Sequence, residues 1–429
     1  ASDVYKRQGI ILDYIIRLSR KTAQRSTEVV RIQLPCSFFF YEQEEWQMSD
    51  GRIDFLYLNE KDMIEAGVLD AGRCVDVMEE VISLMGKGDY LMGGPDHNAH
   101  GLMLEFPKKS KIQGFPLEDS RDRRFIAMPA YLGGRFHVAG QKWYGSNGRN
   151  RAKGFPRSIL MATLNDVETG APLCYMSANL LSSIRTGAMP GLVAKYFAKD
   201  KVGTIGIIGP GVINRSSMRA FMAKFPDIHT VKMVGSTPES KTAQKMKSFI
   251  EEHFPQVSDI RICANVQEAV KDADIVCEAA SVTYPYWPEL KYEWLKPGAV
   301  VISTNGLNIS WEDELKFSKV VDNWGMYEEY AQEDGDEFHP DGTRKNAGTI
   351  GEDFVYMVKD GLIQRDDVKN LADVVNGNVT ARENKDEIFL VSIEGMPIQD
   401  VAWAYECYHA ALKKGIGTML NLWEKPYAL

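Results

Sequence analysis

A strict alternation of apolar runs and helical stretches between residues 202 and 303 most constrains the fold of this chain. The runs are apolar at consecutive positions, as in strands that helices cover on both faces. Such alternation predicts a parallel sheet rather than an antiparallel one. The expected strands are residues 202–208, 231–234, 260–263, 274–279 and 299–303.

A glycine turn follows the first of these strands. Gly209-Pro210-Gly211 stands between the strand and the next helix, the layout of a turn that brings backbone N–H groups to a dinucleotide pyrophosphate. Asn214 replaces the third glycine, and a tight turn without a ligand is the alternative. The predicted cofactor contacts of this turn are Gly209, Gly211, Val212 and Ile213.

The end of the second strand bears on the choice of cofactor. An NAD site usually has an acid there, whereas this chain has Ser236 and Thr237, followed by Lys241. These side chains could accept a 2′-phosphate, which favours NADP slightly over NAD. The alternatives are that Glu239 binds the ribose or that these residues only cap the next helix.

The segments around this α/β unit have a mixed pattern. Short apolar runs broken by Gly, Pro and Asn between residues 103 and 166 predict an antiparallel sheet, and residues 74–85 and 397–413 predict helices. The predicted fold class is therefore α/β, with a Rossmann-type parallel-sheet domain inserted in an α+β domain that binds substrate and dimerises. The expected domains are residues 48–186 with 375–429, and 187–374; residues 1–47 form a leader, either non-native or disordered, or else a peripheral helix.

Composition excludes several classes of protein. Fifty Lys and Arg against 59 Asp and Glu give a net charge of −9, which opposes binding to nucleic acid or to an anionic membrane. The six cysteines form no CxxC pair, and the apolar runs are shorter than a membrane helix needs. We expect a cytoplasmic protein with reduced thiols and no metal.

Four ordered motifs carry a family resemblance. They are Gly140-Gln141-Lys142, the hairpin from Asp166 to Leu173 with Thr169-Gly170-Ala171-Pro172 in its turn, Arg185-Thr186-Gly187-Ala188, and the glycine turn. In this order and spacing the chain resembles the ornithine cyclodeaminase and mu-crystallin family from about residue 55 onward. The resemblance implies a homodimer in which a nicotinamide cofactor lies beside an amino or imino acid.

The resemblance also implies roles for single residues. Lys142 and Arg185 would hold the substrate carboxylate as the catalytic pair, and Thr186 would contact the cofactor phosphate. An arginine fork matches a carboxylate and a lysine supplies a compact charge, although either residue alone is more often a surface cation. Further cofactor contacts are expected where strands of the sheet end, at Ala280, Ser281, Asn305 and Ser392.

Two departures from the family pattern bear on the substrate. Cyclodeaminases carry an aspartate after the strand at 299–303, but this chain has no acid there until Glu312, which disfavours ammonia-releasing cyclisation. Where family members often have an arginine, residues 94–101 offer His97 and His100. A weaker second carboxylate clamp implies a substrate that is bulkier or less charged at that end. We predict substrate contacts from His97, His100 and Asn308; the histidines could donate protons near neutral pH, or lie in a solvated loop.

The sequence therefore predicts an NAD(P)-dependent oxidoreductase that acts on the C–N bond of an imino or amino acid. One alternative is a cyclodeaminase-like lyase that recycles bound NAD, and another is a non-catalytic, crystallin-like protein that binds cofactor and ligand. The acidic stretch 327–341 is expected to be a solvated loop over the cofactor cleft, with Tyr327 or Tyr330 as candidate lid residues.

Overall fold

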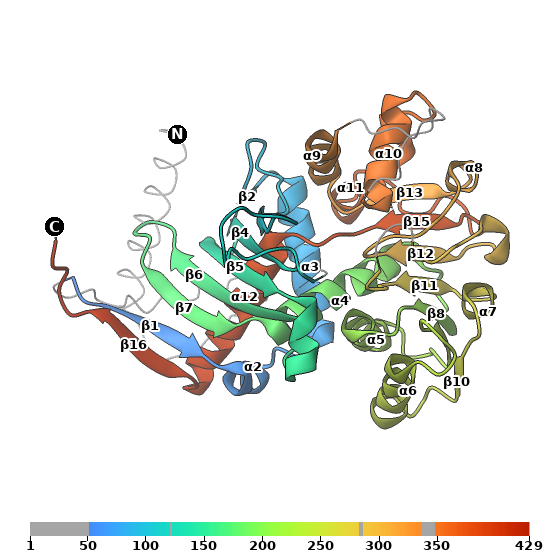
Figure 1. Ribbon diagram of the computed structural model, residues 1–429. Helices are drawn as coiled ribbons and strands as arrows, with labels where there is room; N and C mark the ends of the chain where they lie inside the picture. Colours follow the sequence, from blue (N-terminus) through green and yellow to red (C-terminus); the bar gives the residue numbers. More distant parts are fainter. Residues whose placement is uncertain (1–50, 121, 283–285, 336–347, 429) are drawn as a thin grey trace, which may run out of the picture. The chain divides into compact units, whose positions relative to one another are not determined.

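Two eight-stranded sheets organise the computed structural model, which describes residues 51–120, 122–282, 286–335 and 348–428 (Figure 1). Residues 50–429 form one compact unit. The predicted leader lies outside the described residues. The two sheets lie within this unit and are joined by chain that passes between them more than once.

The first sheet is mainly antiparallel, as the sequence predicts. Its order is β16-β1-β7-β6-β5-β4-β2, with β3 also paired to β4, and only the β1–β7 pair is parallel among the described strands. Its strands are β1 (Ile53–Leu58), β2 (Tyr90–Met92), β3 (Leu102–Glu105), β4 (Arg124–Leu132), β5 (Val138–Ser146), β6 (Ser158–Asp166), β7 (Pro172–Ser177) and β16 (Thr418–Trp423).

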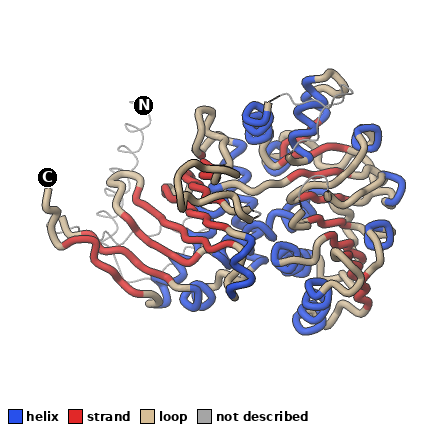
Figure 2. The backbone as a smooth tube through the Cα atoms, in the orientation of Figure 1, coloured by secondary structure: helices blue, strands red, loops and turns tan. Residues whose placement is uncertain are grey.

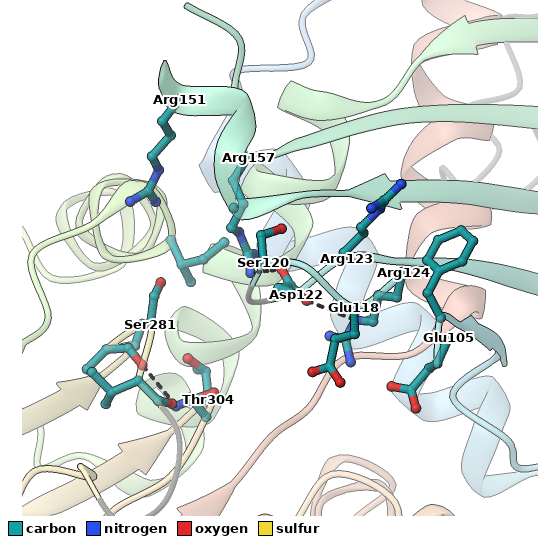
Figure 3. A pocket seen from close by; sticks show the side chains of 17 residues that line it. Glu105, Glu118, Ser120, Asp122, Arg123, Arg124, Arg151, Arg157, Ser281 and Thr304 are labelled. Carbon is teal, nitrogen blue, oxygen red and sulfur yellow. Dashed lines mark hydrogen bonds and ion pairs between the residues drawn. The ribbon is translucent and has the colours of Figure 1, made fainter. Parts of the chain in front are cut away.

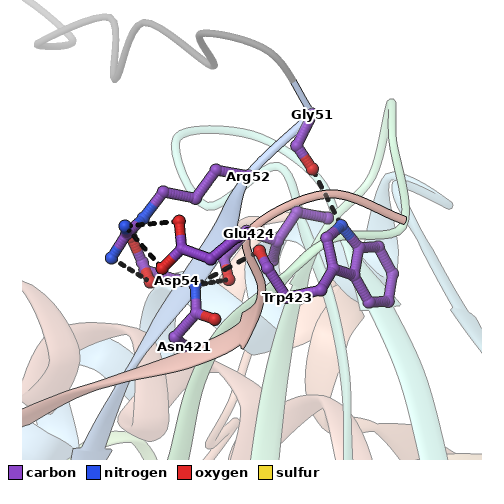
Figure 4. Close-up of polar contacts among 7 residues, drawn as sticks. Gly51, Arg52, Asp54, Asn421, Trp423 and Glu424 are labelled. Atoms are coloured by element: carbon purple, nitrogen blue, oxygen red, sulfur yellow. Dashed lines mark hydrogen bonds and ion pairs between the residues drawn. The ribbon is translucent and has the colours of Figure 1, made fainter. Parts of the chain in front are cut away.

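Polar contacts join the last strand of this sheet to the first (Figure 4). Arg52 pairs with Asp54 and, at 2.7 Å, with Glu424, while the Trp423 indole N–H donates to the Gly51 carbonyl over 2.8 Å. Asn421 donates to the Asp54 carboxylate. The C-terminal strand is thereby fixed in register against β1 at the sheet edge.

Helix α4 spans Asn179–Phe197, so Arg185 and Thr186 lie inside a helix. The Asn179 side chain bonds the backbone of Leu160 and Ser158 and thus fixes the helix start to β6. Gly187 is needed for close packing, because a Cβ there would lie 2.4 Å from the Ser216 side chain on the next helix. Helices α2 (Glu60–Ala66) and α12 (Pro397–Lys414) also pack on the first sheet, and α3 (Ala71–Gly86) packs on α4 and α12.

The second sheet is parallel throughout its described pairs, which confirms the Rossmann-type expectation. Its order is β10-β9-β8-β11-β12-β15-β13-β14, and Figure 2 shows its strands with helices around them. The strands are β8 (Thr204–Ile208), β9 (Thr230–Val234), β10 (Asp259–Ile262), β11 (Ile275–Glu278), β12 (Val300–Ser303), β13 (Ser318–Val321), β14 (Val368–Asn370) and β15 (Phe389–Ser392). The helices are α5 (Val212–Lys224), α6 (Lys241–His253), α7 (Val266–Val270), α8 (Trp311–Glu314), α9 (Trp324–Asp334), α10 (Ile350–Lys359) and α11 (Leu371–Val375).

Strand β15 crosses the domain division drawn from the sequence. That division assigns residues 375–429 to the first domain, whereas β15 lies between β12 and β13 in the second sheet. All four of its residues are buried, as a central parallel strand requires. The chain then returns through α12 to β16 in the first sheet. The return to the first sheet therefore comes after β15 and not at residue 375.

The acidic stretch was expected to be a loop, but its described first part is helical. Helix α9 runs through Asp334, and residues 336–341 of the stretch lie outside the described residues. Tyr327 is fully buried, and its hydroxyl donates to Asp322 Oδ1 over 3.0 Å. A buried phenol in the helix core does not face a cleft, which removes Tyr327 as a lid residue.

Three further features belong to the described residues. Their cysteines (Cys74, Cys174, Cys263, Cys277 and Cys407) are buried free thiols. No group of three His, Cys, Asp or Glu side chains among them is arranged to hold a metal ion. None of the helices in this part of the chain combines the length and the apolarity needed to cross a bilayer.

Candidate active site

A cleft of about 800 Å³ lies where the carboxyl ends of the parallel strands meet the first sheet (Figure 3). Loops that follow β11 and β12, together with the start of α5, form one side; its lining residues, here called the backbone wall, are Ile213, Ala279, Ala280, Ser281, Val282, Thr304 and Asn305. The opposite side comes from the first sheet and its loops, and four of its residues are here called the arginine wall: Arg123, Arg124, Arg151 and Arg157. Ligand sites of open parallel sheets lie at this edge.

The glycine turn has the geometry of a phosphate-binding turn. Gly209 has φ +77°, and a Cβ there would lie 2.5 Å from the Ala280 Cα. Gly211 begins α5 in an extended conformation with no side-chain cap, and the space beside it is open. The uncapped N–H groups and the open approach fit a bound pyrophosphate.

Asn214 stands where the usual pattern has a third glycine, and its side chain is hydrogen-bonded to the turn. Its amide donates to the carbonyls of Ile208, Gly209 and Cys277 over 2.9–3.3 Å, so the side chain ties the turn to two neighbouring strands. Its departure from the usual glycine pattern therefore stabilises the turn.

Glu278 joins the two loops of the backbone wall. Its carboxylate accepts N–H groups from Ala280 (2.6 Å), Asn305 (3.2 Å) and Gly306 (3.3 Å), and the Ser303 hydroxyl at 3.0 Å. Burial raises the pKa of Glu278 to about 7, against the hydrogen bonds that favour its charged form. Asn305 adds a second link, because its amide donates to the carbonyls of Ala280 and Val282.

Lys142, Arg185 and Asp400 form a charged cluster, here called the buried centre, in which Lys142 and Arg185 are the cationic pair. Lys142 lies on β5, Arg185 on α4 and Asp400 on α12, and their side chains are at most 4% exposed. Lys142 Nζ lies 2.8 Å from Asp400 Oδ2, and Arg185 Nε lies 2.8 Å from Oδ1. The Asp400 carboxylate thus pairs with both cations that the sequence motifs contain.

The centre has a charge imbalance that sets its proton chemistry. Burial, and then Arg185, lower the pKa of Lys142 to about 8, against the opposing effect of Asp400. Burial raises the pKa of Asp400, but the two cations outweigh it and keep that pKa below the ordinary value. The carboxylate is therefore charged at neutral pH, and Lys142 loses its proton a little above it.

His100 lies beside this centre as a neutral imidazole. Its Nδ1 bonds the Gly395 carbonyl at 2.9 Å, and a Cβ on Gly395 would lie 2.1 Å from the Arg185 guanidinium. Burial, then Lys142 and Arg185, lower the pKa of His100 to about 4. Because a carbonyl only accepts, Nδ1 carries the hydrogen and Nε2 is an acceptor. A histidine that titrates so low is not the proton donor near neutral pH that the sequence suggested.

The other predicted site residues are less closely gathered. His97 is exposed in a left-handed turn (φ +59°), and Asn308 is exposed with its backbone paired to Pro288 and Leu290. Ser236, Thr237 and Lys241 are exposed after β9, and Thr186 is half-buried beside Arg185. Ser392 is buried, and its hydroxyl accepts from Gly351 N over 3.0 Å. Ile213, Ala280, Ser281 and Asn305 line the cleft, and Val212 is exposed on the first turn of α5.

Two parts of this site were missed in the sequence. The first is Asp400, because 215 and 258 positions separate it from Arg185 and Lys142 and no local pattern shows that it pairs with both. The arginine wall comes from positions spread over 35 residues with no regular spacing. A concentration of arginine between residues 121 and 157 was the available signal.

Comparison with known proteins settles the family. Residues 69–415 match the ornithine cyclodeaminase/mu-crystallin family. The chain belongs to that family. It is 28% identical over 375 residues to N-((2S)-2-amino-2-carboxyethyl)-L-glutamate dehydrogenase of Staphylococcus aureus, covering 86% of this chain and 99% of the relative.

Other members of the family are similar in sequence and fold. Alanine dehydrogenase of Archaeoglobus fulgidus is 32% identical over 297 residues, 69% of this chain and 83% of that protein. A solved archaeal alanine dehydrogenase dimer with bound NAD is 26% identical and superposes with a TM-score of 0.66, covering 86% of this chain and all of the other. The family fold thus extends over nearly the whole described chain.

Proposed function

We propose that this family member is an NAD(P)-dependent oxidoreductase that acts on the C–N bond of an imino or amino acid. The observation that carries the proposal is the buried cationic pair held on Asp400 in the same unit as a phosphate-binding turn and its cleft. The relatives named as dehydrogenases of amino acids support the reaction class.

The residues present fit a dinucleotide cofactor. Gly209, Gly211 and the uncapped start of α5 would hold the pyrophosphate, and Ala280, Ser281 and Asn305 would line the nicotinamide half. When bound, the nicotinamide accepts or supplies the hydride. The exposed Ser236, Thr237 and Lys241 favour NADP, whereas the solved archaeal relative holds NAD.

The cationic pair has hydrogen-bonding capacity left for a substrate. Arg185 uses Nε for Asp400 and Nη1 for Gln399, which leaves Nη2 to donate to a carboxylate. Lys142 donates to Asp400 and, over 3.2 Å, to Ser182, which leaves one N–H. That remaining N–H is the proton source for the substrate nitrogen.

The reaction balances around these groups. In reduction, the imine carbon gains a hydride and the nitrogen gains a proton from Lys142, whose pKa of about 8 makes it an effective acid near neutral pH. In oxidation, the hydride leaves Cα and neutral Lys142 accepts the proton from nitrogen. Asp400 and Arg185 hold the geometry, and burial of the centre excludes water.

Two alternatives belong to other classes. A cyclodeaminase needs an acid near residues 304–308, but Asn305 there is engaged with the carbonyls of Ala280 and Val282. A non-catalytic binding protein would use the same cleft without turnover. We favour the oxidoreductase because Lys142, placed beside the substrate in this proposal, carries an exchangeable proton near neutral pH.

A second copy of the chain is the proposed macromolecular partner. The outer face of the first sheet exposes Phe125, Trp143 and Ile159, and the rings of Phe125 and Trp143 stack with centroids 5.6 Å apart. The solved archaeal relative is a dimer. Light scattering tests this proposal: a dimer mass is expected, and a monomer at working concentration contradicts it.

One assay series separates the three functions. Purified protein is mixed with NADH or NADPH and a cyclic ketimine carboxylate, or with oxidised cofactor and L-alanine, and nicotinamide absorbance is followed. Stoichiometric absorbance change supports the proposal. Ammonia from ornithine with only catalytic cofactor would favour the lyase, and ligand-induced melting shifts without turnover would favour the binding protein.

A further inference from the structure

We propose that the arginine wall is a subsite for a second carboxylate of the substrate. The substrate would then be an N-substituted amino acid, in which one nitrogen joins two carboxyl-bearing units, or the corresponding imine. This inference rests on the proposed function and names its substrate class. It also reverses the sequence-based expectation of a weaker second clamp, because the cations come from residues 123–157 instead of 94–101.

Strand register places Arg124 of the arginine wall on the same sheet face as Lys142. In the β4–β5 pairing, Arg124 lies opposite Ser146, and Met128 lies opposite Lys142. Side chains two or four residues apart on a strand share a face, so Arg124 and Lys142 point the same way. The four-residue offset corresponds to about 13 Å along the strand, a gap that long, flexible Arg and Lys side chains can shorten.

Glu394 relates the arginine wall to the segment beside the cationic pair. It directly precedes Gly395, which contacts Arg185 and His100. Burial, then Asp322, Glu352 and Glu278, raise the pKa of Glu394 well above its ordinary value, and Arg124 opposes them. Arg124 is therefore close enough to act on the carboxyl group that precedes Gly395.

The cations of the wall exceed the carboxylates that pair with them. Arg124 and Arg157 share Asp122, and Arg124 Nε, 2.9 Å from its oxygen, is buried without a hydrogen bond. Arg123 pairs with Asp119 at 2.9 Å, and Asp119 is also engaged by Arg149. Arg151 is exposed and has no ion pair among the described residues. An incoming carboxylate would complete this set.

Both signs of charge border the cleft. Glu105 and Glu118 line it together with the arginines, and Figure 3 shows their carboxyl groups on the side away from Arg151. Arg151 on one side and the two carboxylates on the other would complement the carboxylate and ammonium of an α-amino acid. The dehydrogenase from Staphylococcus aureus is named for such a compound, N-((2S)-2-amino-2-carboxyethyl)-L-glutamate.

The reaction on such a substrate keeps the balance given above. A hydride leaves the carbon that bears the nitrogen, and the nitrogen loses its proton to Lys142, which gives an imine and reduced cofactor. After the imine leaves the buried centre, water adds to the imine carbon, and breaking the C–N bond releases a 2-oxo acid and a primary amine. The arginine wall takes no part in bond changes; it holds the distal carboxylate.

The test compares Arg151→Gln with Arg149→Gln on two substrates. Both arginines lie on the 3₁₀ helix Gly148–Lys153, but only Arg151 lines the cleft, while Arg149 pairs with Asp119. With N-((2S)-2-amino-2-carboxyethyl)-L-glutamate, Arg151→Gln is expected to lower kcat/KM about 10- to 100-fold, the effect of one charge-assisted hydrogen bond. With L-alanine, which has one carboxylate, it is expected to change kcat/KM less than about threefold, as is Arg149→Gln with either substrate.

Calorimetric titration with the same N-substituted glutamate separates failure of this inference from failure of the proposed function. Weaker binding by Arg151→Gln supports the subsite even if no turnover is found. Equal loss for both substrates, loss of NADP⁺ or NAD⁺ affinity alone, or no binding of the N-substituted glutamate to the wild type overturns it. Turnover of L-alanine in that case would leave the proposed function standing.

Discussion

The two walls of the cleft are built by different chemistry. The backbone wall presents mostly small side chains, such as those of Ala279, Ala280 and Ser281, and is held by internal hydrogen bonds, four of which end on Glu278. The arginine wall presents long charged side chains that reach the cleft from strands and loops of the first sheet. A wall of backbone groups suits the cofactor, which is the same in every turnover. A wall of side chains suits the substrate, because substitutions there can change which substrate binds.

The buried centre differs from the arginine wall in its exposure to solvent. Lys142, Arg185 and Asp400 are almost inaccessible, and each charge has a hydrogen-bonded partner. In the arginine wall, the side chains of Arg157 and Arg124 are 40% and 35% exposed. Because buried charges depend on their partners far more than exposed ones do, substitutions in the centre should have the largest effects.

Asp400→Asn should produce the largest loss. It removes the counter-charge of two buried cations, so we expect a cost of about 3–5 kcal/mol in stability and at least about a 100-fold loss of kcat/KM. Because Asp400 raises the pKa of Lys142, its neutralisation should move the alkaline limb of the pH profile below the pKa of about 8. Chemical denaturation and a pH–rate profile measure both effects; an unchanged limb would contradict the assigned coupling.

The glycine turn offers a matched pair. Gly209→Ala forces a Cβ to within 2.5 Å of the Ala280 Cα at φ +77°, so we expect about 1–3 kcal/mol of destabilisation and weaker cofactor binding. Gly211→Ala meets open space at a negative φ and should melt like the wild type. Thermal melting compares them. Equal melting temperatures would show that the turn does not need its left-handed conformation.

Glu278→Gln should act on cofactor affinity more than on turnover. The amide cannot accept N–H groups at both ends, so the two loops of the backbone wall lose their common anchor and the cofactor Kd should rise about tenfold. In the wild type, protonation of Glu278 below its pKa of about 7 should weaken binding as pH falls from 8 to 6.

Fluorescence titration of the reduced cofactor across that pH range measures the effect. The variant should lose the pH dependence, and Glu268→Gln, which removes a similar carboxylate acceptor at the start of α7, should retain it. A wild-type Kd that is flat with pH would refute the anchoring role.

The sequence predicted the parts of the fold that depend on local periodicity. The parallel strands followed from consecutive apolar residues, and the glycine turn and the Lys142 and Arg185 motifs followed from spacing and resemblance. Helix α9 was missed because its charged face resembles a solvated loop, although Tyr327 on its other face is buried. The place of β15 in the second sheet depends on pairing with distant strands, which local pattern does not report.

The site divides in the same way. Ile213, Ala280, Ser281 and Asn305 line the cleft and follow the glycine turn or the ends of strands, features that local sequence pattern predicts; their cofactor contacts stay a prediction. Asp400 and the arginine wall come together only through the packing of α12 and the register of β4 and β5. Long-range charge pairing is set by tertiary structure, so one sequence without its fold does not show it.

The most direct test of the proposed function is the Lys142→Ala enzyme, assayed for both turnover and cofactor binding. Because Lys142 exchanges the proton of the substrate nitrogen, kcat/KM for the imino or amino acid should fall at least about 100-fold. Because Lys142 lies in the buried centre and does not line the cleft, the cofactor Kd should change less than about threefold. Activity equal to that of the wild type would contradict the account.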